Sequence, residues 1–119
     1  MGSDHWANEP VLDFDNALAR LGGDLDLFAD MAGYAIEDTP KLISDLTAAI
    51  KNNDAPVVRM KAHALKGLVA GCGGLRTVAI AQELEDAGEN GDLSNANSLA
   101  AKLVLEVAQL QSALTPHLR

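Results

Sequence analysis

Cysteine, aromatic residues and long hydrophobic runs are scarce in this chain of 119 residues. The single cysteine, Cys72, excludes an internal disulfide and any metal site built from several cysteines, and it is typical of a reducing compartment. No run approaches the roughly 18 apolar residues of a membrane span, and the N-terminus lacks the basic and then apolar pattern of a signal peptide. We therefore predict a cytoplasmic protein that does not bind membranes.

Positive charge is scarce as well. Nine Lys and Arg residues against 17 Asp and Glu residues give a formal net charge of -8. The field of such a molecule repels the phosphates of nucleic acids and anionic membrane surfaces, so neither is a predicted partner. Hydrophobic residues make up 48% of the chain but aromatic residues only 3%. The core must then be built from Leu, Ala, Val and Ile, which favours closely packed helices.

Glycine and aspartate mark the expected helix boundaries. A short helix over residues 14–21 ends at a pair of glycines, and Asp24 then caps a new helix by accepting from its free amides. Asp54 and Asp92 occupy equivalent places, so we predict that three long helices begin at these aspartates. The glycines between residues 71 and 74 predict a tight connection into a further helix.

Pro40 lies inside the first long helix, residues 24–52, where its ring removes a backbone donor and clashes with the preceding turn. The apolar phase nevertheless continues across it in steps of four and three, through Phe28, Ala32, Ala35, Thr39, Leu42, Leu46 and Ala49. We predict one helix kinked near Pro40, with two separate helices as the alternative.

Three further apolar stripes have the helical period. The helix over residues 55–71 has Val58, Ala62, Leu65, Val69 and Cys72. The helix over residues 75–87 has Thr77, Ile80, Ala81, Leu84 and Ala87. The last helix, which ends before Pro116, has Leu99, Leu103, Val107, Leu110 and Leu114.

Short connections make neighbouring helices antiparallel. We predict an all-α fold, an up-and-down antiparallel four-helix bundle over residues 11–115 with the short first helix as a cap. Residues 1–10, which include His5 and Trp6, are predicted to be a disordered tail or an expression remnant, and residues 116–119 a C-terminal tail.

His63 lies outside the buried stripe of its helix. At about 100° per residue, it is roughly 140° from the centre of that stripe, so it has no packing role. Four residues fall within roughly 40° of it on the same wheel, namely Arg59, Lys66, Gly67 and Ala70. Cations and small residues around a nucleophile suit an anionic adduct that another protein approaches. Surface Lys and Arg can also serve only for solvation, and charge alone does not decide between the two.

The run His63-Ala64-Leu65-Lys66-Gly67, followed by Gly73, resembles the histidine-containing phosphotransfer (HPt) domains of multistep phosphorelays, in particular the bacterial type. The spacing of further segments is similar too, over roughly residues 11–114: Leu18 to Asp24, Asp38-Thr39-Pro40, Leu84-Glu85 and Gly91-Asp92. The resemblance implies that His63 accepts a phosphoryl group from a phospho-aspartate of one receiver domain and passes it to an aspartate of another.

The resemblance also implies partners. These are response-regulator receiver domains and a sensor or hybrid histidine kinase. We predict a monomer without cofactor or metal, and a phosphocarrier that has no ATP-binding or kinase activity of its own.

Three residues near His63 receive roles from the resemblance. Lys66 supplies positive charge to the phosphoryl oxygens, and Gly67 leaves room for the group, unless it is a site where helices touch. Glu85 falls where several relatives carry a glutamine, and a carboxylate there could accept from one ring N–H and leave the other nitrogen free. The alternative for Glu85 is a solvated surface residue. Leu68 departs from the small or hydroxyl residue common at this position, which puts any hydroxyl contact to phosphate in doubt.

Residues flanking His63 are predicted to contact the partner. These docking residues are Arg59, Met60 and Ala70; the methionine is soft enough to adapt to both donor and acceptor, although isolated surface methionines are common.

Two enzyme classes do not fit the sequence. A di-metal bundle needs Glu-x-x-His, and none of His5, His63 and His117 has a glutamate three residues before it. A kinase needs a glycine-rich phosphate loop ahead of a helix, and the glycines at 71–74 lack the Gly-Lys-Ser/Thr signature. A helical adaptor that binds a receiver or kinase without carrying phosphate remains the alternative.

Overall fold

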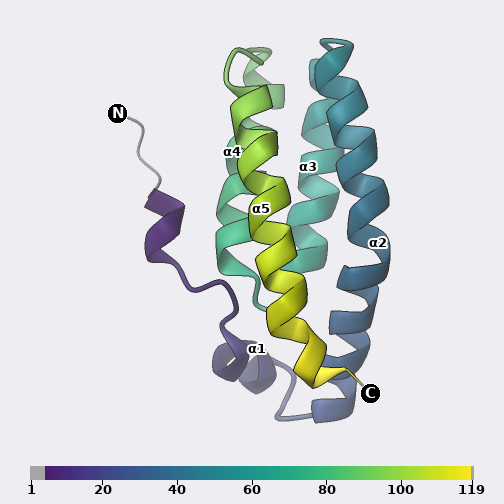
Figure 1. Ribbon diagram of the computed structural model, residues 1–119, viewed down its shortest axis with the longest axis vertical. Helices are drawn as coiled ribbons and strands as arrows, with labels where there is room; N and C mark the ends of the chain where they lie inside the picture. The colour runs from purple at the N-terminus through teal and green to yellow at the C-terminus, as the bar shows by residue number, and fades with distance from the viewer. Residues whose placement is uncertain (1–4, 119) are drawn as a thin grey trace.

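Five α-helices and two short 3-10 turns make up the part of the chain that the computed structural model describes, residues 5–118, and these residues form no strand (Figure 1). In chain order the elements are η1 (His5–Asn8), α1 (Phe14–Arg20), α2 (Leu25–Lys51), α3 (Ala55–Ala70), α4 (Leu75–Asn90), α5 (Ala96–Leu114) and η2 (Thr115–His117). Helices α2 to α5 alternate in direction, and each packs on the next, with α2 closing the bundle against α5. Helix α1 lies at one end. The predicted all-helical bundle with a short N-terminal helix is confirmed.

Aspartate caps start three of the helices. Asp24 accepts from the amide of Leu27 at 3.0 Å, and Asp54 accepts from that of Val57 at 3.3 Å, as predicted. Asp13 caps α1 in the same way, which the sequence analysis missed.

The predicted cap at Asp92 is wrong. Its side chain accepts from the amide of Ser94 at 3.1 Å, in a turn before α5 begins at Ala96. Helix α4 also continues to Asn90, three residues beyond the predicted end, and is closed by Gly91 in the left-handed conformation.

Helix α2 passes through Pro40 without a break, so the alternative of two separate helices is wrong. An interior proline costs about 3 kcal/mol. The buried stripe on both sides offsets this cost, since Ala35 is 3% exposed and Leu46 1% exposed. The predicted kink near Pro40 stays a prediction.

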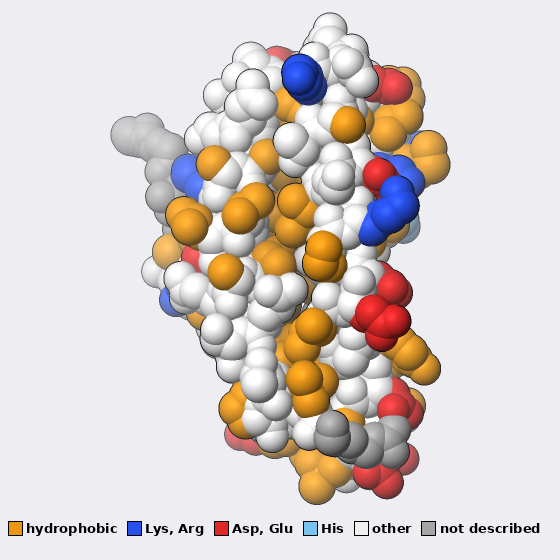
Figure 2. Space-filling view, turned by 45° about the vertical axis from the view of Figure 1, so that its right-hand side comes forward, with side chains coloured by type: hydrophobic (Ala, Val, Ile, Leu, Met, Phe, Trp, Pro, Cys, Tyr) orange, Lys and Arg blue, Asp and Glu red, His pale blue; other side chains and the backbone are white. Residues whose placement is uncertain are grey.

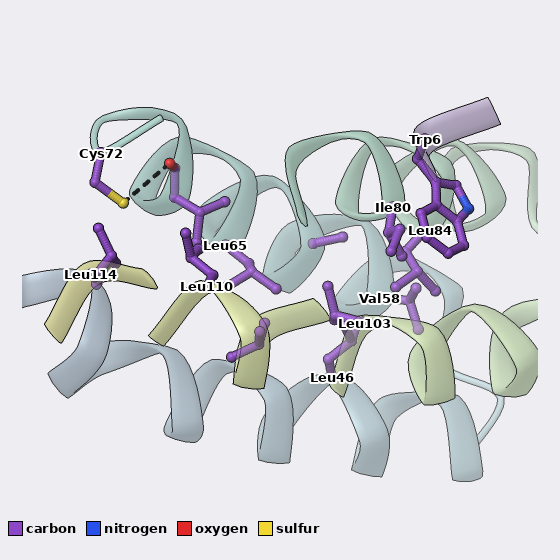
Figure 3. Close-up of a cluster of buried hydrophobic side chains, with 14 of the residues drawn as sticks. Trp6, Leu46, Val58, Leu65, Cys72, Ile80, Leu84, Leu103, Leu110 and Leu114 are labelled. Atoms are coloured by element: carbon purple, nitrogen blue, oxygen red, sulfur yellow. Dashed lines mark hydrogen bonds between the residues drawn. The ribbon is translucent and has the colours of Figure 1, made fainter. Parts of the chain in front are cut away.

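The predicted apolar stripes form the core. Val58, Leu65, Ile80 and Leu84 from α3 and α4 meet Leu103 and its neighbours on α5 (Figure 3). Three stripe positions are only partly buried, namely Leu42, Ala87 and Leu99, and next to Ala87 it is Gly88 that lies fully inside.

Packing begins earlier in the chain than the predicted boundary at residue 11. Residues 1–4 lie outside the described part, but Trp6 in η1 is only 9% exposed and lies beside Ile80 and Leu84 (Figure 3). The Nε of Arg76 donates to the backbone oxygen of Glu9 at 2.6 Å. His5–Asn8 is therefore not a disordered tail, because one tryptophan supplies enough apolar area to anchor the segment without any periodic pattern.

The predicted C-terminal tail also packs in part. The ring of His117 in η2 stacks on Phe14 with centroids 4.2 Å apart, while Arg119 lies outside the described residues. This contact fixes the end of α5 to the start of α1.

The surface formed by α2 and α5 is poor in charge. Figure 2 shows hydrophobic side chains along both helices and in the groove between them, with acidic and basic side chains gathered at the margin of this face. The groove is lined by Pro40, Ile43, Val104, Val107, Ala108 and Gln111. Within residues 5–118, no helix combines the length and the hydropathy that a membrane span requires.

Candidate functional site

His63 is presented to solvent from the middle of α3. The opposite side of this helix is held in the core, where Val58, Ala62 and Leu65 are all 0% exposed. The side chain of His63 is 64% exposed, which confirms the predicted outward orientation. The ring is therefore accessible to a second protein.

Glu85 on α4 contacts this ring. Its Oε2 lies 3.1 Å from Nδ1 of His63, while its own side chain is 17% exposed, so the alternative of a freely solvated glutamate is wrong. The ammonium of Lys66, and to a smaller extent His63, lowers the pKa of the Glu85 carboxyl below its ordinary value, against the opposing effect of burial. An ionised carboxylate can only accept. In the neutral imidazole the hydrogen is then on Nδ1, and the lone pair of Nε2 is left free.

Lys66 is held on the other side of the same carboxylate. Its Nζ lies 2.7 Å from Oε1 of Glu85 and donates to Oε1 of Gln82 at 2.9 Å. The Nε2 of Gln82 in turn donates to Oδ1 of Asp86 at 2.9 Å. The site is thus a chain of contacts in which each oxygen of Glu85 has its own partner.

Gln82 was missed by the sequence analysis. The available signal was its spacing, because Glu85 and Asp86 come three and four residues after Gln82 on α4 and so share a face with it. What the sequence could not supply was the rotation that turns this face toward α3.

Gly67 lies one turn after His63, beside open space. A Cβ atom added there would meet no heavy atom within 4 Å, so the alternative that this glycine lets two helices touch is wrong. A helical glycine is about 1 kcal/mol less favourable than alanine. The structure gives no packing reason for that cost.

The three predicted docking residues lie on α3 on either side of His63. Met60 is 53% exposed. The Nε of Arg59 lies 4.0 Å from Oε1 of Glu89 at the surface. Ala70 is partly buried, and its backbone oxygen accepts from Nη2 of Arg20 at 3.3 Å. Contact with a partner stays a prediction for all three.

The other two histidines lie elsewhere, with His5 4.0 Å from Glu83 and His117 on Phe14. Across residues 5–118, no group of three or more His, Cys, Asp and Glu side chains could hold a metal ion. The site at His63 brings together an exposed imidazole, a carboxylate 3.1 Å from its Nδ1 and an ammonium 2.7 Å from that carboxylate.

The model of the Hpt domain family matches residues 30–113. The chain belongs to the Hpt domain family. The matched stretch contains the whole of α3 and α4, and with them every residue of the contact chain just described. None of the curated proteins matches this Hpt domain.

Two solved structures are similar to this Hpt domain. One is histidine-containing phosphotransfer protein B (HptB) from Pseudomonas aeruginosa PAO1, with 27% identity, coverage of 90% of this chain and 93% of that chain, and a TM-score of 0.82. The other is the HPT domain of an Hpt sensor hybrid histidine kinase from Shewanella. It shares the fold, with 21% identity, coverage of 89% and 92%, and a TM-score of 0.77.

Family membership confirms the predicted resemblance. This Hpt domain is a phosphotransfer domain of phosphorelays, a phosphocarrier without a catalytic kinase domain. Hpt domains work with receiver domains and hybrid kinases.

Proposed function

We propose that His63 is the phosphoacceptor of this domain, and that it takes a phosphoryl group from the phospho-aspartate of one receiver domain and gives it to an aspartate of another. The observation that carries the proposal is the pairing of His63 with Glu85. The 3.1 Å contact at Nδ1 leaves Nε2 unprotonated on a side chain that is 64% exposed. An exposed lone pair on a neutral ring is what a nucleophile needs.

Lys66 and Gly67 complete the site. The ammonium of Lys66, three residues after His63, is one helix step from the ring and can approach the phosphoryl oxygens. The open space at Gly67 admits the phosphoryl group and the loop of the receiver.

The partners are receiver domains of response regulators and a sensor or hybrid histidine kinase. Arg59, Met60 and Ala70 form the surface that meets them, and the exposed Met60 adapts to both donor and acceptor. We propose that the domain acts in the cytoplasm as a monomer.

The test is phosphotransfer from a radiolabelled, phosphorylated receiver to the purified chain. We expect acid-labile label on the chain, and none after His63→Gln. Lys66→Ala should slow the transfer while the circular dichroism spectrum stays unchanged. Label that survives His63→Gln rejects the assignment, and receiver binding without any label supports the adaptor instead.

A further inference from the structure

We propose that the groove between α2 and α5 is a second binding site of this domain, and that it takes an amphipathic helix of a partner protein. This helix has apolar residues along one side and Lys or Arg at one end. The groove is separate from the site at His63, so the inference goes beyond phosphotransfer and does not depend on the role of that histidine.

The first part of the groove is apolar. It is lined by Pro40, Ile43, Val104, Val107, Ala108 and Gln111. Val104 is 49% exposed, and Pro40 across from it on α2 is exposed as well. Figure 2 shows hydrophobic side chains along both helices and in the hollow between them. Apolar side chains that are exposed together, rather than singly, are typical of a surface that another chain covers.

Helix α5 forms an uncharged wall of the groove. Two of its 19 residues are charged, Lys102 and Glu106. Glu106 is 5% exposed, and the ammonium of Lys102 lies 5.8 Å from the centre of the Trp6 ring. The exposed positions of α5 are therefore all uncharged, although 22% of the whole chain is charged. Such a wall loses little hydration when a partner covers it.

The second part of the groove is acidic. It is lined by Ala29, Asp30, Gly33, Tyr34, Glu37 and Leu118. The two parts are in line, because steps of four and three residues on α2 connect Ala29, Gly33, Glu37, Pro40 and Ile43. Between Leu25 and Pro40, α2 has four acidic residues and no Lys or Arg. This end of the groove therefore attracts positive charge.

The walls of the groove favour a helix as the occupant. Both walls are helices, whose backbone hydrogen bonds are made internally, so an extended segment would find no strand edge to pair with. A helix presents apolar side chains at steps of three and four residues, which suits a groove of this kind. From Ala29 to Ile43 the groove is about 21 Å long, the length of a helix of about 14 residues. Lys or Arg at one end of that helix would meet Glu37 and Asp30.

A second copy of this chain suits the groove less well. Each copy has a net charge of -8, so two copies repel each other. The uncharged outer side of α5 in a second copy would also offer no cation to Glu37. A basic helix, by contrast, is attracted by the field of the domain before it makes any contact.

The groove lies on the side of the bundle opposite to His63. Among the four long helices, the packed pairs are α2 with α3, α3 with α4, α4 with α5, and α5 with α2 (Figure 1). His63 and Glu85 belong to α3 and α4, whereas α2 and α5 form the groove. A partner helix in the groove can thus hold the domain while a receiver reaches the histidine.

The experiment measures the binding of a fluorescently labelled synthetic peptide of about 16 residues by anisotropy. The peptide has Leu at helix steps of three and four, Lys at one end, and Ala and Gln elsewhere. A scrambled peptide of the same composition, whose Leu residues do not share a face, is the control. We expect the first peptide to bind with a dissociation constant on the order of 10 µM, and to change the amide NMR shifts of α2 and α5.

Variants of the groove test its two parts. Val104→Glu should weaken binding by about tenfold or more, because it places a charge in the apolar part. Leu105→Glu is the matched control, since Leu105 is 66% exposed but does not line the groove, and it should bind as the native chain does. Glu37→Gln should weaken binding about threefold at low salt and reduce its salt dependence. Glu89→Gln on α4, at a side chain 70% exposed, is the control for that change.

The outcomes are distinct from those for phosphotransfer. His63→Gln should bind the peptide as the native chain does, so a failed assignment of His63 leaves this inference intact. Equal binding of the scrambled peptide, or an equal loss in Leu105→Glu, overturns the inference, because the attraction would then be unspecific. No binding of the first peptide up to about 1 mM also overturns it. A dimer in sedimentation that Val104→Glu abolishes overturns it too, because a second copy would then cover the groove.

Discussion

Gly88 on α4 lies directly against the backbone of Arg59 on α3. A Cβ atom at Gly88 would stand 2.5 Å from the backbone nitrogen of Arg59 and 2.8 Å from its Cα. Gly88 is three residues after Glu85, and Arg59 is four residues before His63, so this contact is one turn from the functional pair on both helices. The close approach of the two helices here allows the Glu85 side chain to reach the ring.

Gly88→Ala should therefore destabilise the domain. Backbone atoms cannot move aside as a flexible side chain can, and overpacking of this kind costs about 2 kcal/mol. We expect a lower midpoint in urea unfolding, and a weaker contact between Glu85 and His63 as the helices separate. An unchanged midpoint would show that the close approach at Gly88 is not a structural constraint.

Gly67→Ala should have the opposite effect on stability. The added methyl group meets nothing within 4 Å, and alanine is favoured over glycine inside a helix by about 1 kcal/mol. We expect a higher unfolding midpoint together with slower phosphotransfer from a receiver, because the methyl group occupies space beside the phosphoryl group. Transfer at the native rate would remove Gly67 from the site.

Gln82 positions Lys66, so Gln82→Leu should slow phosphotransfer without a large loss of stability. The leucine has similar volume but cannot accept from the ammonium, which then samples positions away from the ring. We expect transfer roughly three- to tenfold slower, measured by label transfer under single-turnover conditions. Gln109→Leu, at an exposed position on α5, is the control and should transfer at the native rate.

Acid should weaken the fold through two carboxyls. Lys41 and then Lys61 lower the pKa of Asp45, and Lys66 lowers that of Glu85. Because each pKa is depressed in the folded state, the stabilisation is fully present above the ordinary carboxyl pKa of about 4 and is lost as pH falls through the lower folded value.

Urea unfolding between about pH 6 and about pH 3 measures this loss. Asp45→Asn should be less stable than the native chain at the upper end and should lose less stability toward the lower end. If both chains lost stability in parallel, the ion pairs of Asp45 with Lys41 and Lys61 would contribute nothing.

The helices could be predicted from the sequence because their apolar residues recur with the helical period. The stripes through Val58, Leu65 and Leu103 follow the helical period, and the same period placed His63 on the outside. Single contacts could not be predicted. Trp6 has no periodic partners, and its burial depends on packing in the cluster that contains Ile80 and Leu84, which lie more than 70 residues away in the sequence.

The residues of the site that lie on one helix could be predicted, whereas those contributed by a second helix could be predicted only in part. His63, Lys66 and Gly67 lie within five residues on one helix, so their proximity follows from the sequence alone. Glu85 and Gln82 come from another helix, and whether they reach α3 depends on the rotation of α4 and on the absence of a side chain at Gly88. The resemblance to relatives supplied Glu85, whereas the spacing of Gln82 placed it on the same face as Glu85 but did not show that this face contacts α3.

We propose that Nε2 of His63 is the atom that receives the phosphoryl group. The most direct measurement is 15N and 31P NMR of the chain after reaction with a phosphorylated receiver, which identifies both the histidine and the nitrogen that is modified. We expect a single phosphoryl group, on Nε2 of His63. Phosphorylation at Nδ1, or at His5 or His117, would contradict it.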